Sequence, residues 1–272
     1  CLMSSVTAAR RFVPSLLTAL GLLLTLGSPA AAQDTGPEGL ASLALESFYD
    51  ALDDYDYPVL EEALADLDMV YAKVSPKTLK KIHKAVAKLF KTGPSKAVEW
   101  GDATRPQDAF EGAWGMALAM VHDKDEGPKL IRDALKQRHV KAWPEVRALC
   151  IQALSERVEA EWVDTFLDYL EDDHPAVVAS AVQGLKRFSE HDGALRRRCA
   201  DGLLDVWLEL HEAAEKEARK VREDDPTPAA DALLQVEGSF DDALTRLTRQ
   251  RMSGPLEWKE WFAEHGSDED SW

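Results

Sequence analysis

The sequence is poor in cysteine and contains none of the short motifs that mark most metal, haem and nucleotide sites. Its three cysteines form no Cys-x-x-Cys pair, and its seven histidines are scattered singly, without a His-Glu-x-x-His helix. These absences leave zinc and haem without a set of ligands. A Gly-x-Ser-x-Gly elbow, a P-loop and a dinucleotide-binding fingerprint are also missing. We therefore assign no catalytic residue, no metal ligand and no cofactor, and we expect a protein that is not an enzyme.

Basic residues are outnumbered by acidic ones. The chain has 32 Lys and Arg against 49 Asp and Glu, which gives a net charge of −17 at pH 7. Such a charge repels the phosphate backbone of nucleic acids, and anionic membrane surfaces for the same reason, so neither is expected as a partner. Solubility is a sufficient explanation of the acidity itself.

A long apolar run occurs near the beginning of the chain. Arg10 and Arg11 precede an apolar stretch over residues 12–26, and small residues follow at 28–32. This order is typical of a secretory signal peptide, which we assign to residues 1–32. An uncleaved anchor is the alternative, although a membrane span needs about 18 or more apolar residues. We expect an exported protein, periplasmic or secreted, that does not insert into the membrane after cleavage.

One phrase occurs twice in the middle of the chain. Residues 144–154 return at residues 175–185 after a step of 31 residues, with Pro, Val, Ala, Gln and Leu in identical places. A step of this length accommodates two short antiparallel helices and a turn, which is the unit of an α-solenoid. We predict that the repeated phrase forms helices over residues 143–158 and 174–189.

Helical periodicity continues on both sides of the repeat. Residues 33–93 predict amphipathic helices, of which the first two, with polar outer faces, suit an N-terminal cap. A loop is expected at residues 94–106 and a repeat domain with a C-terminal cap at residues 107–265. The acidic tail at residues 266–272 is expected to be disordered.

Two cysteines, Cys150 and Cys199, follow the signal peptide. We expect both to be small core residues. They belong to different repeat units, whose helices are about 10 Å apart. That spacing exceeds the Cα–Cα separation of about 7 Å that a disulfide tolerates. A disulfide between them is the alternative.

A helix between Ser75 and Gly93 carries a dense basic face. Ser75 can cap its first turn, Pro76 fits that turn, and Gly93 with the following proline ends it. The basic face consists of Lys77, Lys80, Lys81, Lys84, Lys88 and Lys91. It is either a solvated face balanced by carboxylates of the preceding helix or a docking surface for an acidic partner. The balancing carboxylates would be Glu61, Glu62, Asp66 and Asp68.

The repeated Pro-x-Val-x-Ala phrase resembles HEAT repeats, in particular the short bacterial HEAT-like repeats also found in phycobilin lyases. In those repeats the proline begins the second helix, and small residues at the places of Ala148 and Ala179 let adjacent layers approach. Arg147 and Asp173 match the arginine and the acidic turn residue that such repeats often pair. The segment 258–262 looks like the aromatic closing helix of exported bacterial HEAT-repeat proteins.

This resemblance implies an all-α fold, namely a short right-handed α-α superhelix, or HEAT-like solenoid, with helical caps at both ends. Trp258, Trp261 and Phe262 would then be buried against the last long helix, at about residues 229–248. The resemblance does not define a function, because such repeats serve scaffolds, inhibitors and a few enzymes.

Two functions remain. The first is a module that binds a protein or peptide partner on a concave face formed by the second helix of each repeat. The exposed polar candidates on that face are Arg147, Gln152, Gln183 and Lys186. The alternative is a small-ligand binder or enzyme of the same fold. Its pocket would be lined by Trp100, Trp114 and Trp143.

Overall fold

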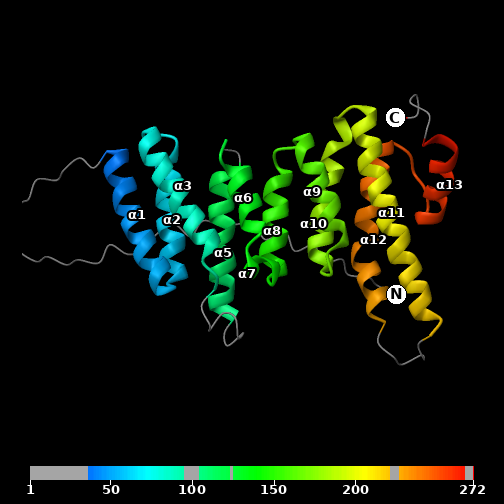
Figure 1. The fold of residues 1–272 in the computed structure, drawn as a ribbon, viewed down its shortest axis with the longest axis horizontal. Coiled ribbons are helices and arrows are strands. Elements are labelled where there is room, and N and C mark those ends of the chain that lie inside the picture. The colour runs from blue at the N-terminus through cyan, green and yellow to red at the C-terminus, as the bar shows by residue number, and fades with distance from the viewer. Residues whose placement is uncertain (1–35, 95–103, 123–124, 221–226, 267–271) are drawn as a thin grey trace, which may run out of the picture. The chain divides into compact units, whose positions relative to one another are not determined.

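The structure of the protein is a computed structural model that describes residues 36–94, 104–122, 125–220, 227–266 and 272. All regular secondary structure in these residues is helical, and none of them forms a strand (Figure 1). The predicted all-α class is therefore confirmed. Within the same residues, none of the helices combines the length and the apolar character that a membrane span requires. The predicted signal peptide and Trp100 lie outside the described residues.

The first group of helices covers the chain up to the first copy of the repeat. Their bounds are α1 Pro37–Asp54, α2 Tyr57–Tyr71, α3 Pro76–Lys91, α5 Thr104–Val121, α6 Gly127–Leu135, α7 Arg138–Lys141 and α8 Pro144–Ser155. Those of the second half include three short 3-10 helices. Their bounds are η1 Ala160–Trp162, α9 Val163–Asp168, η2 Tyr169–Glu171, α10 Pro175–Lys186, η3 Arg187–Glu190, α11 Gly193–Ala218, α12 Pro228–Thr248 and α13 Pro255–His265.

Contacts between helices arrange them in two series. The second series consists of α2, α5, α8, α10 and α12, and each of these helices contacts the next one along the chain. In the first series, α1 contacts α3, α3 contacts α6, and α9 contacts α11. Each first-series helix also contacts one of the second series, in the pairs α1–α2, α3–α5, α6–α8, α9–α10 and α11–α12.

The two copies of the repeated phrase form α8 and α10, which have the same length of 12 residues and begin at Pro144 and Pro175. Proline suits this position because its fixed φ matches the first helical turn and its missing N–H would have no partner there. The repeated valines and leucines are buried, as are Cys150 and its counterpart Ala181, whereas the repeated alanines at 148 and 179 are half-buried. Gly184 allows a close approach, since a Cβ there would lie 3.0 Å from the Phe166 ring.

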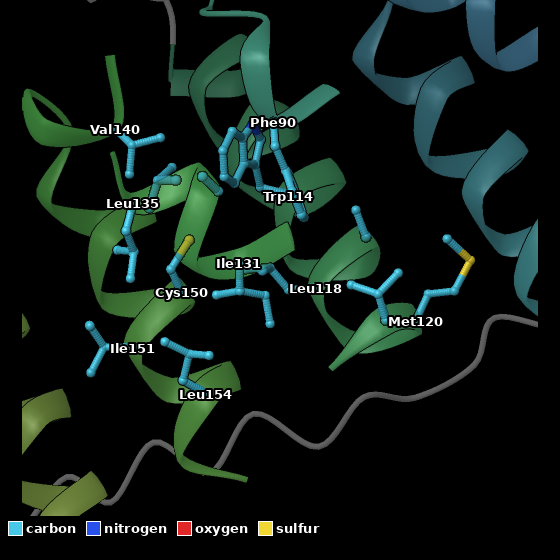
Figure 2. Close-up of a cluster of buried hydrophobic side chains, with 14 of the residues drawn as sticks. Phe90, Trp114, Leu118, Met120, Ile131, Leu135, Val140, Cys150, Ile151 and Leu154 are labelled. Atoms are coloured by element: carbon cyan, nitrogen blue, oxygen red, sulfur yellow. The ribbon is translucent and has the colours of Figure 1, made fainter. Parts of the chain in front are cut away.

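Buried apolar side chains of both series form one core from Ala41 to Trp258. Figure 2 shows the part of it around Trp114, Ile131 and Cys150. Cys150 and Cys199 are both free and fully buried. Burial raises the pKa of the Cys199 thiol to about 12, because the thiolate would lose its hydration. The prediction of small core residues is confirmed, and the disulfide alternative is wrong.

The outer seam of the terminal pair α1–α2 differs from the polar face expected of a cap. Leu40, Leu43 and Met69 are 47%, 58% and 65% exposed. They line a hollow of about 250 Å³ together with Val70. The prediction of a wholly polar outer face is therefore wrong at these positions.

The C-terminal helix α13 is anchored by one tryptophan. Trp258 is fully buried, and α13 packs mainly on α11 rather than on the expected α12. Trp261 and Phe262 are half-buried, and their rings lie 5.8 and 5.5 Å from the ring of Trp272. The indole of Trp272 donates to the carbonyl oxygen of Gly266 at 3.3 Å. Trp272 is thus packed on α13, and residues 267–271 of the tail predicted to be disordered lie outside the described residues.

We expect the substitution Glu61→Gln to raise the free energy of unfolding at pH 7 by less than about 1 kcal/mol. The half-buried carboxyl group lies over Gly112 of α5, where an added Cβ would collide with it. Desolvation raises its pKa in the folded state. Ionisation therefore destabilises the fold progressively from the unfolded-state pKa upward and fully above the folded-state pKa, and the gain should vanish below about pH 3, where both states are protonated. Urea unfolding across this pH range measures it; equal gains at both ends would contradict the desolvation argument.

Candidate functional site

A polar groove with a volume of about 570 Å³ crosses α8, α10, η3 and α12. Its lining consists of Gln152, Ser155, Ala179, Ser180, Gln183, Lys186, Arg187, Ser189 and Arg246. Three of these side chains are basic and none is acidic, although the chain as a whole carries a charge of −17. The groove therefore differs in charge from the average surface of the molecule.

A second hollow, of about 280 Å³, lies between α5 and α8. Its lining is mostly small or apolar and consists of Gly115, Leu118, Ala119, His122, Leu149, Gln152, Ala153 and Glu156. Because Gln152 lines both hollows, they adjoin. We call the two together the α5–α12 groove, which is apolar at α5 and polar at α12.

The two glutamines of the repeat both line this groove. Gln152 in α8 and Gln183 in α10 hold the same place in the repeated phrase, and both are exposed. They point away from the core because the buried positions of their helices lie on the other face, as with Cys150 and Ala181. Among the described residues, neither side-chain amide has a hydrogen-bond partner. Both amides are therefore available to a ligand.

The basic residues of the groove differ in their partners. Lys186 bonds Asp242 of α12. Arg187 forms a bidentate pair with Glu156 just after α8, with N–O distances of 2.7 and 3.0 Å. Arg246 has no ion-pair partner within the part of the chain that the structure describes, and it is exposed. Arg246 is thus the cation of the groove that is left to bind an anionic group.

Arg147 lies outside the groove, in contrast to the exposed position expected for it. Its side chain is only 11% exposed. Its Nε and Nη2 donate to the two carboxylate oxygens of Asp172 at 2.9 and 2.8 Å, and Nη1 donates to the carbonyl oxygen of Lys141. Asp172 also accepts from the backbone N–H of His174 at 2.9 Å. Arg147 therefore joins α8 to the end of α7 and to the turn before α10.

The carboxylate that pairs with Arg147 is thus Asp172 and not the neighbouring Asp173, which the resemblance to HEAT repeats suggested. Asp173 is exposed. The two residues differ by one position, and the sequence alone does not show which of them faces α8.

The tryptophans proposed for a small-ligand pocket are packed against other rings. Trp114 is fully buried, with its ring 4.6 Å from that of Phe90 and 6.1 Å from that of Phe110. The ring of Trp143 lies 5.4 Å from that of Phe110. Trp100 is outside the described residues. Trp114 and Trp143 thus belong to one aromatic cluster, and a ligand would have to displace part of the core to reach the ring of Trp114.

Metal binding finds no support in the geometry either. Across the ranges that the structure describes, no three side chains of His, Cys, Asp or Glu are grouped so as to hold a metal ion. The polar groups that converge are the amide, hydroxyl and basic groups of the α5–α12 groove. These groups can donate and accept hydrogen bonds.

Sequence reasoning missed Arg187 and Arg246 as lining residues. Arg187 follows Lys186 directly and could have been found by continuing along the helix. Arg246 follows Gln183 by 63 residues along the chain (246 − 183), and it enters the groove because α12 packs on α10. No local pattern indicates that contact.

Comparison with known proteins adds no relative. Nothing matched this chain in the comparisons with protein-family models, with curated proteins and with solved structures. The proposals that follow therefore depend on the geometry and the chemistry of the described residues.

Proposed function

We propose that the protein is an exported, non-enzymatic HEAT-like solenoid that binds an extended segment of a partner protein in the α5–α12 groove. The observation that carries this function is the pair of repeat-equivalent, exposed and unpaired amides of Gln152 and Gln183. The two series of helices, contacting in chain order, support the solenoid. The signal-like order of residues 1–32 supports export to the periplasm or beyond.

A glutamine amide is complementary to a peptide unit, because each has an N–H donor and a C=O acceptor. Packed helices are about 8–10 Å apart, and an extended chain advances about 3.3 Å per residue. Amides on α8 and α10 can therefore bond peptide units about three residues apart. Ala179 and Ser180 lie beside them and leave room for a backbone. Such binding recognises an extended main chain.

Selectivity for side chains would come from the two ends of the groove. Leu118, Leu149 and Ala153 at the α5 end offer apolar contacts. Arg246 at the α12 end offers an unpaired cation. The partner segment that fits best is thus extended, with apolar residues at one end and an acidic residue at the other.

The proposed function predicts that Gln152→Ala with Gln183→Ala weakens partner binding about tenfold or more, since each amide would lose hydrogen bonds with no substitute. The partner segment is first mapped with a photo-crosslinking residue at Ser180 in the groove and, for comparison, at the exposed Ser42 of α1. A synthetic peptide of the segment that is crosslinked from Ser180 alone is then titrated against the variants.

The matched control is Gln235→Ala, which removes an exposed glutamine of α12 outside the groove lining. Its affinity should equal that of the parent chain. The groove assignment fails if Ser180 and Ser42 give the same products, or if the mapped peptide binds the double variant as tightly as the control.

A further inference from the structure

The helix α3 presents five exposed lysines on a strongly acidic protein. Its apolar stripe, including Ile82, Val86 and Leu89, is buried against the core. The exposed lysines of α3 are Lys77, Lys80, Lys81, Lys84 and Lys91. We call these five residues the α3 lysine face. Lys88, on the same helix, is only half-exposed.

The carboxylates expected to balance this face do not pair with it. Among the described residues, none of the α2 carboxylates forms an ion pair with a lysine of α3, and Glu61 is turned toward Gly112 of α5. The ion pair that α3 does form joins Lys88 to Asp53 of α1 at 2.6 Å. The five lysines of the α3 lysine face have no ion-pair partner in the described ranges. The α2 carboxylates therefore do not balance these lysines by direct ion pairs.

A second acidic residue of α1, Glu38, contacts the beginning of α3. Glu38 accepts hydrogen bonds from the backbone N–H of Ser75 and from the hydroxyl of Thr78, at the first turn of α3. The hydrogen bond from Thr78 and, less strongly, the charge of Lys81 lower the pKa of Glu38. Because Glu38 lies at the first turn of α3, it does not pair with the lysines farther along the helix.

The spacing of the lysines lowers the stability of helix α3 when no ligand is bound. Lys77 and Lys81, and likewise Lys80 and Lys84, are four residues apart, so like charges are neighbours on the helix surface and repel each other. Lys77 also lies in the first turn, where the helix dipole disfavours a positive charge. An anionic ligand would relieve both effects. Glu38 offsets part of this repulsion at the first turn, and the remaining unpaired lysines are a candidate functional surface.

We propose that the α3 lysine face binds an acidic segment of a partner protein. The 16 residues of α3 span about 24 Å, which corresponds to about seven residues of an extended chain. A short segment rich in Asp and Glu can therefore contact the whole face. This surface lies on a helix of the first series and contributes nothing to the α5–α12 groove lining, so it is independent of the proposed function.

The negative charge of the rest of the protein would repel a long polyanion more than a short acidic peptide. Apart from these five lysines, the chain carries a net charge of −22, obtained by removing five positive charges from −17. A DNA duplex or an anionic bilayer extends past α3 and would approach that acidic surface within a Debye length of about 8 Å. A segment of about seven residues avoids this repulsion.

The test is a titration of the full chain with a fluorescein-labelled peptide of about eight glutamates, which covers the length of α3, followed by anisotropy. The substitutions Lys77→Gln, Lys81→Gln and Lys84→Gln together should weaken binding about tenfold or more, as expected for several partly exposed charge pairs. Arginine at the same three positions should retain it. Added NaCl should weaken binding to the parent chain, because the contacts are between exposed charges.

The control removes the same charge elsewhere, by Lys129→Gln, Lys216→Gln and Lys220→Gln on α6 and the end of α11, all at exposed positions. It should bind like the parent chain, and circular dichroism should show that all variants are folded. Equal losses in both triple variants, or no binding to the parent chain, would overturn the proposal. So would tighter binding of a short DNA duplex or of phosphatidylglycerol vesicles, which would indicate a surface for polyanions in general.

Discussion

Replacement of Arg147 by alanine is expected to lower the free energy of unfolding by about 3 kcal/mol, the range for breaking a buried ion pair from one side. The side chains of Arg147 and Asp172 are each only 11% exposed, and two N–O contacts of 2.8 and 2.9 Å join them. The substitution leaves the carboxylate of Asp172 poorly hydrated and without its cation. It also removes the hydrogen bond to the carbonyl oxygen of Lys141 at the end of α7.

Urea unfolding of the single and double variants with Asp172→Ala measures the coupling between the two side chains. Arg187→Ala is the control, since Arg187 also forms a bidentate pair, donating through Nη1 and Nη2 to the carboxylate of Glu156. Their side chains are about 40% exposed, so that loss should be less than about 1 kcal/mol. Similar losses for Arg147→Ala and Arg187→Ala would show that burial does not determine the strength of these pairs.

The contrast between these two arginines shows where sequence reasoning stops. The prolines at 144 and 175 and the repeated apolar positions correctly predict where α8 and α10 begin. They also predict which positions are buried, because burial within one helix follows from its periodicity. The orientation of a long polar side chain depends on a partner from another segment. Arg147 turns toward Asp172 because the turn before α10 lies there, and the helix pattern contains no information about that turn.

The residues that line the groove could also be predicted only in part. Gln152 and Gln183 follow from the repeat, since identical places on successive helices face the same side. Lys186 also lines the groove, although it is only partly exposed and pairs with Asp242. Arg246 could not be found, because its position depends on the packing of α12 against α10. The polar outer face predicted for the terminal pair α1–α2 was wrong for a related reason. Among the described residues this pair has a neighbouring pair on one side, and the apolar Leu43 is exposed on the other.

Replacement of Trp114 by alanine is expected to lower the free energy of unfolding by about 3–5 kcal/mol, the largest effect anticipated for a single core residue. Trp114 is fully buried on α5 and packs against Phe90 of α3, with ring centroids 4.6 Å apart (Figure 2). Its ring also meets that of His139 in α7, at 5.9 Å. Truncation would therefore open a cavity where three helices meet, and the neighbouring rings could fill it only by leaving their own contacts.

The substitution Trp114→Phe separates the packing of the ring from the polarity of the indole. Within the described residues, the buried Nε1 of Trp114 has no hydrogen-bond partner. A phenyl ring keeps much of the volume and removes a buried donor that costs free energy when unpaired, so the loss should stay below about 1.5 kcal/mol. Thermal and urea unfolding of both variants measure the difference. If Trp114→Phe destabilised the protein as much as Trp114→Ala, the indole N–H would have to contribute through a hydrogen bond, and the aromatic cluster would owe its stability to polarity as well as packing.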